Sequence, residues 1–381
     1  MSCWGAERTG IWSTTRLRST DRSAWRLAVT VGAACIGLSA CSTTPLSPYT
    51  ADTPPLVLVP AEQAGVIDKR ARFREIYCAV LEARKRNLPD YRSCDDALTR
   101  VGVEPAATGR PVELGPSQRN LVAGLVPGVG WECFSDWLQL SGTVAAHVRQ
   151  FGYDFRMIEV DGLSGTEHNA GAIREAVLAM QLNGTERRLV LIGYSKGAPD
   201  ILEAVVRYPE IREKVAAVVS VAGAVGGSAL ANDATQSQLD LLRHWPGSRC
   251  EIGDEQAVKS LRPAIRQTWL AQNPLPRDVP YYSVVAYPHP DRISAGLRSS
   301  YAKLSKIDAR NDSQVVFYDE VIPGSTLAAY VNADHWAVAV PVSRAHSFIA
   351  STFTTQNAYP REALLEAILR FVEEDLATAQ R

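Results

Sequence analysis

The chain has 381 residues, enough to bury one large α/β core or two smaller ones. Hydrophobic residues make up 46% and charged residues 21%, a composition typical of globular proteins that excludes extensive disorder. The 40 lysines and arginines almost balance the 41 aspartates and glutamates, and no basic run is interleaved with aromatic residues, so nothing indicates a nucleic-acid-binding protein.

The first 40 residues have the pattern of an export signal. Four arginines precede an apolar run over residues 27–38, which is too short for a typical membrane-spanning helix. The run ends at Leu38-Ser39-Ala40-Cys41, which resembles the lipobox of bacterial lipoproteins. That resemblance implies that the chain is cut before Cys41, which then carries lipids, and two or three acyl chains anchor a protein stably. Plain secretion with cleavage near Ala40 is the alternative.

The same resemblance indicates where the protein resides. A serine rather than an aspartate at position 42 favours the outer over the inner membrane. We therefore expect a protein of the bacterial cell envelope, facing the periplasm and held to the membrane by its N-terminal lipids. Residues 41–55 are the lipidated cysteine and a tether rich in Ser, Thr and Pro, which cannot build a core.

Four cysteines remain after the signal and the lipobox, namely Cys78, Cys94, Cys133 and Cys250. An even number in an oxidising compartment predicts two disulfides, for which three pairings are possible. The Cys78–Cys94 pair is favoured because both residues lie in one helical stretch near the N-terminus, which leaves Cys133–Cys250. No C-x-x-C spacing or histidine cluster accompanies them, which argues against a metal site.

Residues 56–115 are expected to form a helical extension packed on a catalytic domain of residues 116–381. Helical spacing over 66–84 places Ile76, Val80 and Leu81 on one face, and a second short helix is expected over 94–101. The first disulfide would clamp this pair of helices.

From residue 116 onward, strand and helix patterns alternate. Strands are expected over residues 121–126, 155–160, 189–192, 215–221, 281–286 and 327–331. Helices are expected over residues 134–151, 169–182, 198–207 and 364–376. This alternation predicts a parallel sheet with helices on both faces.

The strongest chemical signal is the G-x-S-x-G of Gly193-Tyr194-Ser195-Lys196-Gly197, which lies between a strand pattern and a helix pattern. A serine on such a turn exposes its hydroxyl, and the glycines let strand and helix approach closely. The first amides of the helix point at the serine, ready to bind an oxyanion. The arrangement resembles the nucleophile turn of the α/β-hydrolase superfamily, which makes Ser195 the candidate nucleophile. An ordinary turn with an uninvolved serine is the alternative.

This resemblance to lipases and esterases implies an α/β-hydrolase fold and a Ser-Asp-His triad, with the acid and then the histidine following the nucleophile in the chain. His335, after the strand pattern 327–331, resembles the "D-H" loop near the C-terminus of that family, and His346 is the second choice. Asp312 resembles the acid of that family. Other candidate acids remain open, namely Asp291, Asp308 and Asp319.

An oxyanion needs two amide donors in such an enzyme. Lys196, the residue after the nucleophile, would supply one. The other is expected from the segment after the strand 121–126, at the position of the family's "H-G" motif, where Ala123 replaces the histidine. Leu125 is the first choice for this donor and Val126 the second.

Residues 224–278 resemble the helical cap that lipases and esterases carry over the active site; a packing elaboration without a role in substrate binding is the alternative. We therefore expect a serine hydrolase that cleaves lipid-like or other apolar acyl esters and needs no cofactor. Two other functions remain open: an acyltransferase with the same triad, and a non-catalytic binding lipoprotein that retains the fold.

Overall fold

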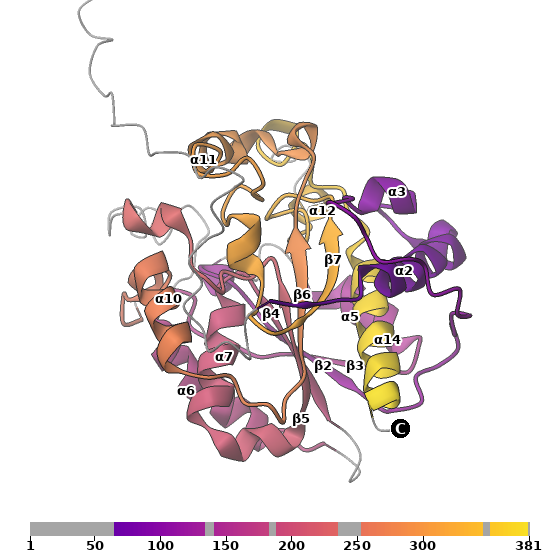
Figure 1. Ribbon diagram of the computed structural model, residues 1–381, viewed down its shortest axis with the longest axis horizontal. Helices are drawn as coiled ribbons and strands as arrows, with labels where there is room; N and C mark the ends of the chain where they lie inside the picture. Colours follow the sequence, from indigo (N-terminus) through magenta and orange to yellow (C-terminus); the bar gives the residue numbers. More distant parts are fainter. Residues whose placement is uncertain (1–64, 134–140, 183–187, 235–252, 346–350, 380–381) are drawn as a thin grey trace, which may run out of the picture. The chain divides into compact units, whose positions relative to one another are not determined.

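A parallel sheet of seven strands organises the described part of the chain, in the order β1-β7-β6-β5-β4-β2-β3 (Figure 1). The computed structural model describes residues 65–133, 141–182, 188–234, 253–345 and 351–379. The strands are β1 (Ile67–Asp68), β2 (Val122–Val126), β3 (Asp154–Met157), β4 (Leu189–Tyr194), β5 (Val215–Val221), β6 (Tyr281–Ala286) and β7 (Thr326–Val331). The expected parallel α/β fold is confirmed.

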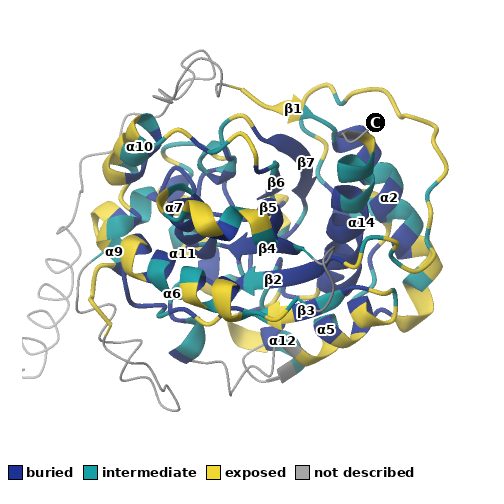
Figure 2. Cartoon of the chain, turned by 90° about the horizontal axis from the view of Figure 1, so that it is seen from below, coloured by how far each residue is buried: buried dark blue, intermediate teal, exposed yellow. Residues whose placement is uncertain are grey.

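Helices cover both faces of the sheet (Figure 1). One face carries α2 (Arg70–Arg84), α5 (Ser141–Arg149) and α14 (Arg361–Ala379), and the other carries α6 (Thr166–Ala179), α7 (Gly197–Arg207) and α10 (Pro263–Gln272). Every residue of β4 and β5 is buried, as Figure 2 shows for the centre of the sheet. Continuous apolar strands suit this position because both of their faces are covered.

The N-terminal segment contributes to the same sheet and the same core. Residues 66–69 were expected in a helix, but Ile67 donates its N–H to Ser325 at 2.9 Å and so lies in an edge strand beside β7. The helix begins at Arg70, and its Phe73 ring meets Phe371 of α14 edge-on, with ring centroids 5.6 Å apart.

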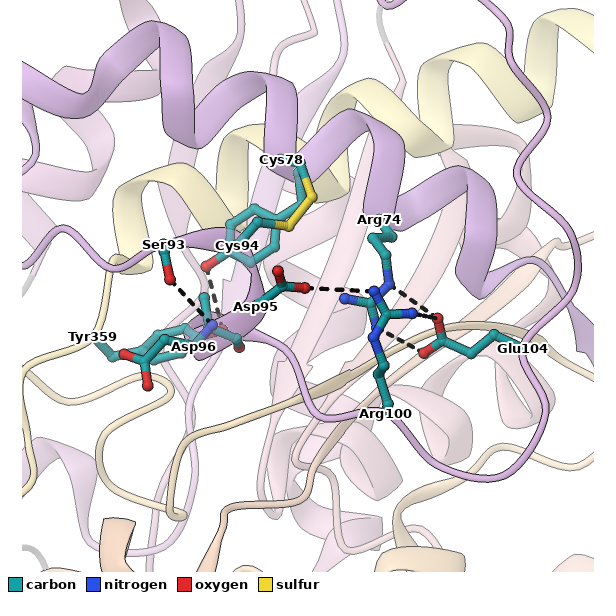
Figure 3. Close-up of a disulfide and its surroundings, with 11 residues drawn as sticks. Arg74, Cys78, Ser93, Cys94, Asp95, Asp96, Arg100, Glu104 and Tyr359 are labelled. Atoms are coloured by element: carbon teal, nitrogen blue, oxygen red, sulfur yellow. Dashed lines mark hydrogen bonds and ion pairs between the residues drawn. A yellow bond between two sulfur atoms is a disulfide. The ribbon is translucent and has the colours of Figure 1, made fainter.

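The predicted helix over 94–101 is shorter than expected. It spans α3 (Cys94–Ala97), because Leu98 turns extended and bridges Val331 at the end of β7. The disulfide Cys78–Cys94 ties α3 to α2, as predicted (Figure 3). The short segment after Cys94 therefore supports the carboxyl end of β7.

The second predicted disulfide is only partly within the described residues. Cys133 is disulfide-bonded, whereas Cys250 lies outside them, so the pairing stays a prediction. The signal segment, Cys41 and the tether also lie outside the described residues. Within the part that the structure describes, no helix combines the length and the hydropathy needed to cross a bilayer.

The insertion after β5 packs partly into a helix layer. It contains α9 (Ala257–Ser260) and α10, while residues 235–252 lie outside the described part. Leu270 of α10 belongs to the core beneath α6 and α7. In Figure 1, by contrast, α11 (Arg298–Leu304), from the connection between β6 and β7, lies beyond the carboxyl ends of those strands. Part of the segment expected as a cap is thus a packing element.

Candidate active site

Ser195 lies on a tight turn between β4 and α7, with a φ of 55°, a backbone conformation that is strained for a residue with a side chain. The flanking glycines make this turn possible. A Cβ on Gly193 would lie 2.5 Å from the amide nitrogen of Ala198, and one on Gly197 would lie 2.8 Å from the carbonyl oxygen of Pro127. Both approaches are too close for any side chain, so the motif's glycines allow strand, turn and helix to touch.

The structure brings Ser195, His335 and Asp312 together in one hydrogen-bonded line. His335 follows β7, and its Nε2 lies 2.9 Å from Ser195 Oγ. Its Nδ1 is hydrogen-bonded to Asp312 Oδ2. Asp312 is fully buried and His335 is 5% exposed, so little water competes for these bonds. The second-choice histidine, His346, lies outside the described residues.

The Asp312 carboxylate is held by the backbone of its own loop. Its Oδ1 accepts hydrogen bonds from the amides of Gln314 and Val315, each at 2.8 Å, which leaves Oδ2 for the imidazole. The Asp312 carbonyl oxygen also accepts the backbone N–H of His335 at 2.9 Å. One residue therefore fixes both the ring and the backbone of the histidine.

The other candidate acids lie elsewhere. Asp291 is exposed and pairs with His289 at 2.7 Å, and this hydrogen bond lowers the pKa of its carboxyl group. Asp308 pairs with Arg310 beside it in the chain. None of the hydrogen bonds among the described residues joins Asp319 to a histidine. Among the hydrogen bonds of the described residues, Asp312 is the one of these four acids whose carboxylate is bonded to His335.

Two further residues support the histidine and were not identified from the sequence. Tyr194, the middle residue of the motif, donates its hydroxyl to the His335 carbonyl at 2.7 Å, with the ring centroids 5.2 Å apart. Asp334 accepts the amides of Ser294 at 2.7 Å and Ala337 at 2.8 Å. Burial raises the pKa of the Asp334 carboxyl group. Their positions within the motif and beside His335 were the only signals, and neither specifies these distant partners.

The position of Leu125 contradicts the prediction that its amide is an oxyanion donor. Leu125 lies inside β2, and its carbonyl accepts the amide of Ile158 at 2.9 Å, so its peptide edge faces β3. The N–H and C=O of one strand residue point to the same side, so the Leu125 amide is directed into the sheet rather than toward Ser195. Val126, the second choice, is still within the strand and pairs with Gly193.

The loop after β2 lies next to Ser195 instead. A Cβ on Gly128 would sit 2.7 Å from Ser195 Cβ and 3.1 Å from its Oγ. Pro127 has no N–H. None of the hydrogen bonds among the described residues uses the amides of Gly128, Val129 or Lys196. Unpaired amides at such positions can stabilise a developing negative charge, and Lys196 is the one among them that was predicted from the sequence.

An apolar cavity of about 80 Å³ lies between the sheet and the α5–α14 layer, close to this site. Its walls include Trp131 from the loop after β2, Tyr194 beside the nucleophile, and Val338 from the histidine loop. Leu364 of α14 is among the residues that close it, and Arg361 is its only charged lining residue among those described.

We compared the chain with known proteins and solved structures. No protein-family model and no curated protein matches the chain. The chain is similar to the crystal structure of the metagenomic carboxyl esterase MGS0156, with 43% identity and a TM-score of 0.78, over 85% of this chain and 97% of that one.

The chain is less similar to two lipases of known structure. Mature Bacillus licheniformis lipase BlEst2 shares 20% identity with a TM-score of 0.48, over 60% of this chain and 89% of that one. Staphylococcus hyicus lipase shares 11% identity with a TM-score of 0.48, over 71% and 99%. By its similarity to this carboxyl esterase, the chain belongs to the same family and is an esterase-like enzyme of the α/β-hydrolase fold.

Proposed function

We propose that this enzyme hydrolyses carboxylic esters through an acyl-enzyme on Ser195. The observation that supports this most directly is the hydrogen-bonded line from Ser195 Oγ through His335 to Asp312. A serine hydroxyl is a weak nucleophile near neutral pH, and an adjacent imidazole can accept its proton as the oxygen attacks. Asp312 would hold that imidazole in the required tautomer.

The proposed reaction has two halves. Ser195 Oγ bonds to the ester carbonyl carbon while its proton passes to His335 Nε2, which gives a tetrahedral oxyanion. The carbon–oxygen bond to the alcohol then breaks, and the alcohol leaves with the proton from His335. Water repeats the sequence on the acyl-enzyme: it gives a proton to His335, attacks the carbonyl carbon, and releases the carboxylic acid and the free Ser195 hydroxyl.

The amides of Lys196 and of the segment 128–129 are the proposed oxyanion donors. Both flank Ser195, and neither is engaged in a hydrogen bond among the described residues. Preorganised backbone donors stabilise the tetrahedral intermediate without needing to reorient during the reaction.

The apolar cavity supports acyl esters with a short hydrocarbon chain as substrates. Its volume of about 80 Å³ is smaller than the roughly 150 Å³ of an engineered apolar cavity that holds benzene. Its walls reach Tyr194, directly before the nucleophile. An acyl chain of only a few carbons would gain hydrophobic burial here, at about 0.8 kcal/mol per methylene.

The test combines covalent labelling with a chain-length series. The purified protein should react with a fluorophosphonate probe and hydrolyse p-nitrophenyl esters, with the highest kcat/KM for short acyl chains. Ser195→Ala should lose both properties, whereas Ser117→Ala, near the amino end of β2, should keep both. Equal labelling of the Ser195→Ala variant would exclude this serine as the nucleophile.

We further propose that the mature enzyme is anchored to the cell envelope through lipids on Cys41. The support is the lipobox-like Leu38-Ser39-Ala40-Cys41 after the basic and apolar signal pattern. Fractionation of cells that express the full chain tests this. Cys41→Ser should move the protein from the membrane fraction to the soluble fraction, and retention in the membrane fraction would contradict the anchor.

A further inference from the structure

The side chain of Lys196 is buried directly behind the nucleophile. It is 1% exposed, and its Nζ lies 2.9 and 2.7 Å from the two carboxylate oxygens of Asp200, which is itself fully buried. Burial raises the pKa of the Asp200 carboxyl group, which shows the cost of enclosing this charge. Buried ion pairs often contribute little net stability compared with apolar residues of similar size, and some fix a geometry instead.

Hydrogen bonds connect this ion pair to a neighbouring helix and a neighbouring loop. Asn169 of α6 donates its amide to Asp200 Oδ2 at 2.8 Å and to the carbonyl oxygen of Asp161 at 2.9 Å. The Asp161 carboxylate in turn accepts the amide of Leu163 at 2.9 Å and the hydroxyl of Ser164 at 2.7 Å, which closes the turn 161–164 after β3. The nucleophile turn is thus tied to the loop after β3.

That loop directly contacts the loop that carries the free amides of residues 128 and 129. The carbonyl oxygen of Gly162 accepts the amide of Gly130 at 3.3 Å. A Cβ on Gly162 would lie 2.5 Å from the same Gly130 nitrogen, so the two backbones are in close contact. A Cβ on Gly162 would also lie 2.2 Å from Oε2 of Glu132, a residue of the segment after β2.

These contacts connect the two sides of the proposed oxyanion hole behind Ser195. We propose that Lys196, through Asp200 and Asn169, is a positioning residue that fixes the Lys196 amide relative to the amides of residues 128–129. This inference rests on the proposed ester hydrolysis. The Lys196 ammonium itself touches no substrate; its role is to hold the donors at the separation that the tetrahedral intermediate requires.

We expect the loss of this connection to weaken stabilisation of the transition state more than it weakens substrate binding. Oxyanion donors act on charge that develops during the reaction, so their displacement lowers kcat more than it changes KM. Loss of one oxyanion donor costs about 10²- to 10³-fold in kcat, and misplacement by ~1 Å costs up to about 10²-fold. We therefore expect a loss of kcat of roughly 10- to 100-fold when the connection is broken.

The main variant is Lys196→Met/Asp200→Asn, which removes both charges together and leaves an amide oxygen for Asn169. A second variant, Asn169→Ala, keeps the ion pair but breaks the connection to residue 161, so the test does not depend on one variant folding. Arg207→Met is the matched control, because it removes another i,i+4 ion pair of α7, Arg207–Glu203, together with the Arg207–Glu167 pair that joins α7 to α6. Kinetics on p-nitrophenyl butyrate and inhibition by an alkyl boronic acid are measured for each.

Both test variants should show the loss of kcat with KM little changed, and a rise in the boronic acid inhibition constant by a similar factor. Arg207→Met should match the wild type in all three quantities. Wild-type kcat and boronic acid affinity in either folded test variant, alongside an inactive Ser195→Ala, would overturn the positioning role and leave the proposed function standing. Activity that survives in Ser195→Ala would overturn both.

Discussion

Asp312 holds His335 at two points: its carboxylate bonds the imidazole Nδ1, and its backbone carbonyl accepts the backbone N–H of His335 at 2.9 Å. The two residues are 23 positions apart in the chain, yet their loops meet as a single unit at the carboxyl edge of the sheet. The histidine therefore cannot shift without disturbing the loop of its acid. This rigidity suits the proposed role of His335 as a base, which must remain within hydrogen-bonding distance of Ser195.

Asp312→Asn should lower kcat by about 10³- to 10⁴-fold with little loss of stability. The backbone contacts of residue 312 persist, but an amide nitrogen facing Nδ1 favours the wrong tautomer, and the imidazolium loses its counter-charge. Ester hydrolysis and thermal unfolding of the same preparation check this. Asp291→Asn, which removes the exposed alternative acid, should behave like the wild type, and a comparable loss of kcat in that variant would contradict the assignment.

Gly128→Ala should displace the nucleophile. The new methyl group would lie 2.7 Å from Ser195 Cβ and 3.1 Å from its Oγ, so either the loop or the serine must move. We expect a fall in kcat of about 10²-fold, the size associated with a misplacement of ~1 Å. Gly142→Ala is the control, since a Cβ at that helix position meets nothing within 4 Å. Normal fluorophosphonate labelling rates in Gly128→Ala would argue against this close approach.

Asp319→Asn should stabilise the protein increasingly as the pH rises. Asp319 is partly buried, and a Cβ on Gly226 would lie 2.4 Å from its Oδ1 and 3.1 Å from its Cγ. Burial raises the pKa of Asp319 from 3.8 to about 7. The folded state therefore binds more protons than the unfolded state between these values, and the wild type loses stability as the pH rises from about 4 to about 7.

Urea unfolding at pH 4, pH 5.5 and pH 8 measures this effect. The free energy of unfolding of Asp319→Asn, relative to the wild type, should increase from the lowest to the highest pH, by on the order of 1.4 kcal/mol for each unit of pKa shift. A difference that stays constant over this range would show that Asp319 titrates normally in the folded protein.

Removal of the Cys78–Cys94 disulfide should lower stability more than activity. The bond closes a loop between residues 16 positions apart, which corresponds to about 3 kcal/mol in the chain-entropy description. Cys78→Ser/Cys94→Ser should therefore unfold at lower urea concentration, while kcat at 25 °C stays near wild type because Leu98 still bridges Val331. The single variants Cys78→Ser and Cys94→Ser should each reproduce the shift, and a double variant as stable as the wild type would contradict it.

Much of the fold followed from local sequence patterns. The apolar run at 215–221, broken only by Ser220, forms a buried strand with the expected bounds, because an almost continuous apolar segment is stable where both of its faces are covered. Errors occurred where distant partners decide the structure. Residues 66–69 have a helical pattern, yet their backbone pairs with β7 almost 260 residues later, and Leu98 leaves its helix to bridge Val331. Neither partner can be identified from a local window.

In the candidate site, too, some residues could be predicted from local sequence patterns and others could not. Ser195 could be identified because its turn depends on glycines next to it in the chain, and His335 and Asp312 could be proposed from their order after it. The Leu125 assignment failed because the free amides depend on where β2 ends and which neighbour each peptide faces. The i,i+4 spacing of Lys196 and Asp200 is visible in the sequence, but their burial is not.

The sequence by itself determined the strand-turn-helix that presents a serine hydroxyl, since backbone sterics over five residues set that geometry. Only the tertiary structure decided which carboxylate reaches the imidazole, which amides remain unpaired, and what encloses Lys196. Those outcomes depend on contacts between loops that are far apart in the chain, and such contacts form only when the strands pair and bring their carboxyl ends to one edge.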